Sequence, residues 1–242
     1  MSKKLKLALF DYDGTIVDSA IMIVEGAIAA FRMCGLPDPN PQKVRENIGK
    51  PLAIALDEYM PPGYNVTPDQ ISEAYRSWYA EQGRLGLQNE PLYNGVVDLL
   101  KELKADEWLI GIATNKSRIG LMNGLAKHHM SNFFDITLTT DENIPKPNPA
   151  MAIKAMKDLG VKDKFCVIIG DTINDIGLGV NAGITSIGVN WGYNNRNLLL
   201  TAGATQLVEN ANDIRKILCN PSTISKFDND IWIYIERRQT QS

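Results

Sequence analysis

Short apolar runs alternate with amphipathic stretches along most of the chain. The first run, residues 5–10, ends before an Asp-Gly turn at residues 13–14, which is typical of a buried strand. After residue 94 further apolar runs recur between helical patterns. This alternation predicts βαβ units and therefore a parallel sheet. The later strands are expected at 107–113, 135–139, 165–169, 185–189 and 206–208, and the helices at 95–104, 117–128, 149–159, 173–182, 195–202 and 211–218.

A proline-rich stretch without a convincing strand separates the first strand from the others. Prolines are concentrated between residues 37 and 91, and several of them directly precede a helical pattern, where their fixed φ suits a first helical turn. The expected helices here are 20–33, 42–48, 52–60 and 69–82. We therefore expect a helical cap domain over residues 17–93 and a Rossmann-like core built from residues 1–16 and 94–242.

The later strands favour one fold class. The runs 109–113 and 167–169 are apolar on both faces, as in a sheet that helices cover on both sides. The expected fold is therefore α/β, a doubly wound parallel sheet with a Rossmann-like core and an inserted helical cap. The last residues, 219–242, do not continue the alternation, and their apolar segment 231–235 indicates either a packed tail or strand, or a self-association segment.

The charge balance, the lengths of the apolar stretches and the cysteines argue against several classes of protein. The 242 residues carry 25 basic and 28 acidic side chains, so no basic footprint for nucleic acid is expected. No apolar stretch is long and uncharged enough to span a membrane. The three cysteines lie far apart and form no familiar zinc pattern, which favours reduced thiols in a cytoplasmic protein. Both a monomer and a homodimer remain open.

Polar side chains follow four of the predicted strands. In open α/β sheets, ligands bind beyond the carboxyl ends of the strands, so we expect these side chains to gather at one edge. They include four carboxylates and a hydroxyl, together with lysine. The candidates are Asp11 and Asp13 after the first strand, Thr114, Asn115 and Lys116 after the second, Lys146 after the third, and Asp171 and Asp175 after the fourth.

This set of residues favours phosphoryl transfer. The carboxylates of Asp11, Asp13, Asp171 and Asp175 would repel one another in one crevice, and a hard divalent cation such as Mg²⁺ would relieve the repulsion. Lys146 suits a phosphate oxygen, and Thr114 with the amides that follow it can donate to phosphate at a helix start. One aspartate would attack phosphorus to form an aspartyl phosphate, and a second would protonate the leaving alcohol and then activate water.

The same segments resemble four motifs of the haloacid dehalogenase-like hydrolase superfamily. Residues 11–19 (DYDGTIVDS) are similar to its first motif, 114–117 (TNKS) to the second, 146–149 (KPNP) to the third and 170–175 (GDTIND) to the fourth. Each motif alone is weak, but all four occur in order at predicted strand ends. The segment 189–193 also resembles the phosphoglycolate phosphatase-like branch, whose members carry a helical cap after the first motif.

The resemblance assigns roles one residue at a time. It implies that Asp11 is the nucleophile and a metal ligand, and that Asp13 is the general acid and base with its backbone carbonyl on the metal. Thr114 and Asn115 would bind phosphate. Lys146 would orient it, and Asp171 would ligate Mg²⁺ while Asp175 acts on the metal, through water, or on Lys146. The implied activity is a Mg²⁺-dependent phosphatase for a small phosphorylated metabolite, most like phosphoglycolate phosphatase.

Other interpretations remain beside this one. In the cap, Arg45 and Lys50 lie in a segment that resembles the family's substrate-specificity loop, although both could also be solvated surface charges. A sugar-phosphate mutase or other phosphotransferase would keep the same four motifs. A non-catalytic phosphate-binding regulator is a more remote alternative, because Asp11 and Asp13 are both retained. Lys116 is interpreted as an exposed residue at a helix start, and Asp18 as a helix cap.

Overall fold

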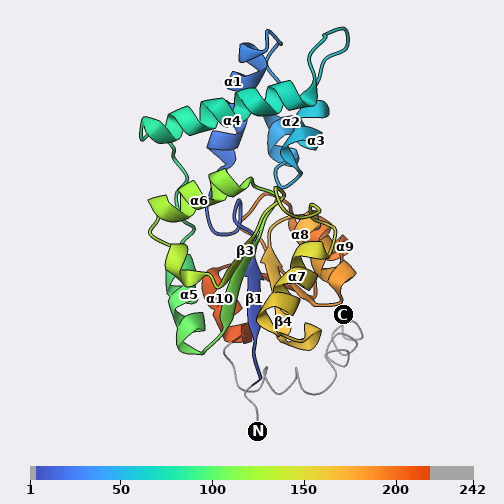
Figure 1. Ribbon diagram of the computed structural model, residues 1–242. Helices are drawn as coiled ribbons and strands as arrows, with labels where there is room; N and C mark the ends of the chain where they lie inside the picture. The colour runs from blue at the N-terminus through green and yellow to red at the C-terminus, as the bar shows by residue number, and fades with distance from the viewer. Residues whose placement is uncertain (1–3, 219–242) are drawn as a thin grey trace.

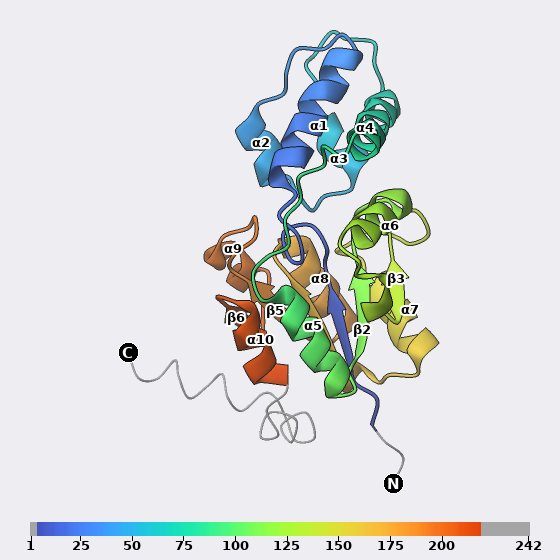
Figure 2. The same cartoon turned by 90° about the vertical axis from the view of Figure 1, so that its left-hand side faces the viewer.

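The computed structural model describes residues 4–218. Its centre is a parallel sheet with the strand order β3-β2-β1-β4-β5-β6 (Figures 1 and 2). The sheet therefore confirms the predicted doubly wound α/β core, and each strand lies within one residue or two of its expected range. The strands are β1 (Leu7–Phe10), β2 (Leu109–Ala113), β3 (Ile136–Leu138), β4 (Cys166–Gly170), β5 (Thr185–Val189) and β6 (Gln206–Val208).

Alternation within each strand builds two separate cores. In β1, Ala8 and Phe10 pack in one hydrophobic cluster, whereas Leu7 and Leu9 pack in another. The first cluster includes side chains of α5, α6 and α10, and the second includes side chains of α7 and α8. Both faces of the sheet are thus covered, which explains why its strands are apolar on both sides. The core helices are α5 (Val96–Ala105), α6 (Arg118–Lys127), α7 (Ala150–Leu159), α8 (Ile173–Ala182), α9 (Arg196–Thr201) and α10 (Ala211–Leu218).

Four helices inserted between β1 and α5 form a body of their own above the carboxyl ends of the strands (Figure 2). They bury a third hydrophobic cluster, in which Phe31, Leu56 and Ile71 are almost completely shielded. Pro41 and Pro68 each open a helix at its first position, as the sequence predicts. The four are α1 (Ala20–Met33), α2 (Pro41–Glu46), α3 (Leu52–Asp57) and α4 (Pro68–Arg84).

The chain passes from the core into the cap and back again through two adjacent connecting segments. Val17 forms an antiparallel bridge with Leu92, and the Tyr93 amide donates to the Ile16 carbonyl at 3.0 Å. Asp18 was expected to cap α1, but the N-cap position is Ser19, which makes no side-chain capping bond; Asp18, one residue earlier, accepts from the Ala20 amide at 3.2 Å. The backbone bonds of Val17 and Tyr93 join the segment that enters the cap to the segment that leaves it. We therefore propose that the boundary lies here, with a core of residues 1–16 and 94–242 and a cap of residues 17–93.

The predictions about membrane spans and about cysteines can be compared with the described residues. Between residues 4 and 218 no helix is long and apolar enough to cross a membrane. Cys34 and Cys166 are free thiols, the former partly exposed and the latter buried. The segment 231–235 and Cys219 lie outside the described residues.

Candidate active site

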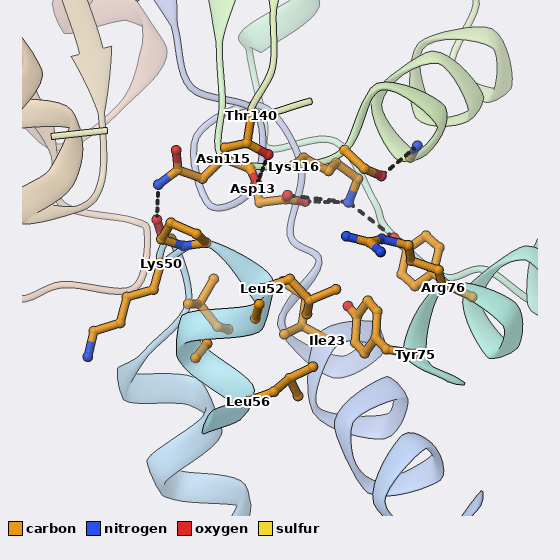
Figure 3. Close-up of a pocket in the computed structure, with 18 of the residues that line it drawn as sticks. Asp13, Ile23, Lys50, Leu52, Leu56, Tyr75, Arg76, Asn115, Lys116 and Thr140 are labelled. Carbon is orange, nitrogen blue, oxygen red and sulfur yellow. Dashed lines mark hydrogen bonds and ion pairs between the residues drawn. The ribbon is translucent and has the colours of Figure 1, made fainter. Parts of the chain in front are cut away.

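The polar residues predicted at the strand ends do converge. Asp11 follows β1, Thr114 and Asn115 follow β2, and Asp171 follows β4, and all four side chains are buried. Parallel strands place their carboxyl ends at one edge of the sheet, so residues remote in sequence meet there. Figure 3 shows Asn115 and Asp13 side by side at this edge, with the cap helices opposite.

Lys146 is the central cation of the site. Its ammonium lies 2.8 Å from Asp11 Oδ1 and 2.5 Å from Asp175 Oδ1, and only 1% of its side chain is exposed. Burial alone would lower the pKa of Lys146, but the charges of Asp11 and Asp175 outweigh it and raise the pKa. The lysine is therefore held fully protonated between the two carboxylates.

Three carboxylates share this one ammonium. Oxygens of Asp11, Asp171 and Asp175 all lie within 4.8 Å of one another. Burial is the largest cause that raises the pKa of Asp11 and of Asp171, and the charge of Asp175 adds to it in both cases. A set of buried, mutually repelling carboxylate oxygens fits a hard divalent cation, which would offset the excess negative charge. The Asp13 carboxylate is not part of this cluster.

Neighbouring groups hold two of these carboxylates in place. Asp171 accepts bonds from the Thr15 hydroxyl and from the Tyr193 amide, each at 2.9 Å. Asp175 accepts from the amide and the hydroxyl of Thr172 at 2.9 and 2.7 Å. Gly14 has a φ of +84°, and a Cβ there would lie 2.3 Å from Asp171 Oδ2, so only glycine fits against that carboxylate. These contacts orient the oxygens toward the same small volume.

Asn115 joins three parts of the site through its side-chain amide. Its Oδ1 accepts from the Lys146 amide at 2.9 Å, and its Nδ2 donates to the Gly49 carbonyl at 2.8 Å. The Gly49 carbonyl also accepts from Asn174 Nδ2 at 3.1 Å. Asn115 therefore positions the segment that carries Lys146 and seats the cap loop on the core. The Thr114 hydroxyl accepts from the Lys116 amide at 3.3 Å, in the turn expected to bind phosphate.

Lys116 corrects one interpretation of the sequence. It was expected to be exposed, but only 10% of its side chain is accessible, because the ammonium lies 3.0 Å from Asp13 Oδ1. It also lies 3.3 Å from the Tyr79 hydroxyl and 3.6 Å from Glu90 Oε1. The charges of Asp13 and Glu90 raise the pKa of Lys116 against the lowering effect of burial. Lys116 thus links the expected acid of the reaction to a cap helix and to the segment that leaves the cap.

The two cap residues proposed to read the substrate are placed differently. Arg45 is exposed on α2 and is absent from the lining of the cavity above the strand ends. Lys50 does line that cavity, but its ammonium pairs with Glu58 at 2.7 Å, and its side chain points away from Asp13 in Figure 3. The structure therefore brings Asp11, Thr114, Asn115 and Lys146 together and leaves Arg45 apart from them.

Comparisons with known proteins agree with this arrangement. The family model described as haloacid dehalogenase-like hydrolase matches residues 8–189. The chain belongs to the haloacid dehalogenase-like hydrolase family. As a hydrolase of this family, it contains all four motifs inside the matched range, with Asp11, Thr114 and Asp171 directly after strands and Lys146 in the segment between β3 and α7.

Individual relatives cover most of the chain. It is 30% identical to the probable phosphatase IndB of Dickeya dadantii, over 86% of this chain and 91% of that protein. It is 27% identical to the phosphoglycolate phosphatase of Vibrio vulnificus, over 79% of this chain and 86% of that one. A crystal structure from Haemophilus somnus, described as a predicted phosphoglycolate phosphatase, superposes with a TM-score of 0.78 at 25% identity, over 90% of this chain and 99% of that one.

Proposed function

We propose that this hydrolase is a phosphatase that cleaves a small phosphate monoester through an aspartyl-phosphate intermediate. The observation that carries the proposal is the buried Lys146 ammonium, which lies against Asp11 within a cluster of three carboxylates at the ends of the strands. The phosphatase names of its relatives support the same reaction. A cytoplasmic location remains a prediction from the sequence.

In this proposal Asp11 attacks the phosphorus atom. The new bond joins an Asp11 carboxylate oxygen to phosphorus, and the bond between phosphorus and the ester oxygen breaks. Lys146 offsets negative charge on Asp11 and on the phosphate oxygens in the transition state. The Thr114 hydroxyl and the amides after it donate to those oxygens. Water then attacks the phosphorus of the aspartyl phosphate, which releases inorganic phosphate and restores Asp11.

Asp13 is the proposed acid and base. It gives a proton to the leaving alcohol in the first step and takes one from water in the second. In this structure Lys116 holds its carboxylate at 3.0 Å, so Asp13 must exchange part of that ion pair for the ester oxygen when substrate binds. Lys116 is therefore a positioning residue, which fixes the Asp13 carboxylate at the mouth of the site.

Asp11, Asp171 and Asp175 are the proposed ligands of Mg²⁺. When bound, the ion would neutralise carboxylate and phosphate charge. We expect a chelator to abolish phosphate release and Mg²⁺ to restore it, whereas Ca²⁺, with its looser coordination, should support much less turnover. The measurement is inorganic phosphate released from a panel of phosphate monoesters by dialysed protein with each ion. Full activity in the chelated, metal-free sample would contradict the assignment, and absence of phosphate release from every ester would overturn the phosphatase proposal.

The role of Asp13 predicts a dependence on the leaving group. Asp13→Ala should reduce turnover of an alkyl phosphate by about 10²-fold or more, because the alkoxide needs a proton as it leaves. The same variant should lose much less on p-nitrophenyl phosphate, whose phenolate is a good leaving group. In the structure Lys116 also lies 3.6 Å from Glu90 Oε1, and this second carboxylate partner is retained in the variant's sequence. Equal losses on the two esters would show that Asp13 acts only through structure.

A further inference from the structure

A cavity of about 640 Å³ extends from the strand ends into the cap. Asp11, Asp13 and Asn115 line one end of it, and helices α1, α3 and α4 supply most of the other. Figure 3 shows Ile23, Leu52, Leu56 and Tyr75 gathered on the cap side, opposite Asp13. This volume lies within the range of roughly 300–1,000 Å³ typical of pockets for drug-sized ligands. The cavity is thus larger than a phosphate group with a small alcohol requires.

The cap side of the cavity is mainly apolar and partly aromatic. Ile23 and Ala27 of α1 and Leu52 and Leu56 of α3 line it together with Tyr59 and two tyrosines of α4. The rings of Tyr75 and Tyr79 stack with their centroids 5.8 Å apart and an interplanar angle of 21°. Such a wall favours a planar apolar group, because aromatic faces pack well on one another and on aliphatic side chains.

Charged cap residues contribute little to this wall. The Lys50 ammonium is paired with Glu58, and Arg45 is outside the lining. Arg76 lines the cavity from an exposed position on α4. A small anionic alcohol such as glycolate would therefore leave the partly exposed side chains of this wall, Ile23, Leu52, Tyr59 and Tyr75, in contact with water.

The cap loop is seated on the core around this cavity. The Gly49 carbonyl accepts bonds from Asn115 and Asn174, at 2.8 and 3.1 Å. Gly49 has a φ of +94°, and a Cβ there would lie 2.7 Å from the Thr172 methyl group, so the close approach of the loop requires glycine. The apolar wall consequently faces the catalytic carboxylates with the loop already docked.

We propose that the alcohol part of the substrate carries an aromatic ring, which binds in the cap cavity while the phosphate binds at Asp11. The inference rests on the proposed phosphatase function and names the substrate class of the same site. The ring packs among Ile23, Leu52 and Tyr75, which are partly exposed, and burial of the ring in both the bound state and the transition state supplies specificity.

The first test compares three esters on the wild-type protein with Mg²⁺. Phenethyl phosphate and ethyl phosphate have aliphatic leaving alcohols of similar acidity, so they differ mainly in the ring, and phosphoglycolate supplies the small anionic alternative. We expect kcat/KM for phenethyl phosphate to exceed that for each of the other two by roughly tenfold or more, the scale of burying one large apolar group. Equal or higher kcat/KM for ethyl phosphate or phosphoglycolate would overturn the inference.

A matched pair of variants on α3 locates the ring. Leu52→Trp fills the cavity from its wall and should reduce the preference for phenethyl over ethyl phosphate to near unity. Ile54→Trp makes a similar change two residues away, at a side chain that is 54% exposed and is not part of the lining, and should keep the preference. Thermal unfolding of both variants checks that they fold. An unchanged preference in folded Leu52→Trp would place the ring elsewhere and contradict the proposal.

Binding of non-hydrolysable analogues separates the substrate class from the reaction. Phenylpropyl phosphonate and propyl phosphonate mimic the two esters, and calorimetry measures their dissociation constants for the wild-type protein with Mg²⁺. We expect the aromatic phosphonate to bind roughly tenfold more tightly. If no ester is hydrolysed but this difference is found, the phosphatase proposal fails and the aromatic site stands. Equal dissociation constants would overturn the aromatic site whatever the activity.

Discussion

Asp11→Asn is expected to lower phosphate release by at least about a thousandfold while the protein remains folded. The proposed mechanism needs a carboxylate oxygen at this position to attack phosphorus, and a neutral amide is a poor nucleophile. Asparagine has nearly the same shape as aspartate, so the buried position at 2% exposure can accommodate it. The change also removes one of three clustered carboxylates, and Lys146 keeps Asp175 as its partner at 2.5 Å.

A second asparagine variant controls for this experiment. Asp18→Asn changes another carboxylate on the same segment, outside the cluster, and an asparagine there can still accept the bond from the Ala20 amide. It should release phosphate at close to the wild-type rate. Initial rates of phosphate release and thermal unfolding curves are measured for both variants. A folded Asp11→Asn protein with near wild-type turnover would remove Asp11 from the role of nucleophile.

The parallel sheet, and the gathering of polar residues at the carboxyl ends of its strands, could be predicted from the sequence because both follow from the local order of apolar runs and helical stretches. Runs such as 109–113 are apolar at every position, which requires cover on both faces, and helices lie between successive runs, which requires parallel strands. Parallel strands in turn place the residues after them at one edge. Asp11, Lys146 and Asp171 meet for this topological reason, although long segments of chain separate them.

The side-chain partners within the site depend on tertiary packing that no local pattern describes. Lys116 follows a strand and precedes a helix, which is compatible with an exposed position. Its burial results from Glu90 and Tyr79, which the segment leaving the cap and helix α4 bring against Asp13. The signal that could have identified it was its place in a strand-end motif beside Thr114 and Asn115. In the same way, Lys50 lies just before α3 and Glu58 just after it, and their pairing depends on how the two side chains fold back along that helix.

In the cap, too, the helices could be predicted from the sequence, but the cavity between them could not. Prolines and amphipathic stretches predict its helices, and α1 spans the expected range 20–33. The cavity between those helices depends on how closely α1, α3 and α4 approach one another, and on a loop whose Gly49 contacts the core. Helical periodicity assigns Leu56 and Tyr75 to an apolar face without indicating whether that face packs against protein or lines a pocket.

Lys146→Met is expected to destabilise the metal-free protein by about 3–5 kcal/mol, in addition to abolishing turnover. Removal of one member of a buried ion pair leaves the other charge without compensation, and here two carboxylates lose the same ammonium. Lys154→Met is the matched control, because Lys154 pairs with Asp158 at 2.7 Å on the surface, where both side chains are about half exposed. That change should cost less than about 1 kcal/mol.

The loss of stability in Lys146→Met should grow as the pH rises. Burial already raises the pKa of Asp11 above its ordinary value, and Lys146 is the group that lowers it again, so its removal raises that pKa further. The folded variant then binds more protons than its unfolded chain above the ordinary pKa of aspartate, and its stability falls with pH through that range. Urea unfolding with a chelator, at about pH 5 and about pH 8, measures both variants against wild type. If Lys146→Met costs no more than Lys154→Met, or if its cost is the same at both pH values, the carboxylates around Lys146 do not carry the mutual repulsion that makes this cluster suited to a divalent cation.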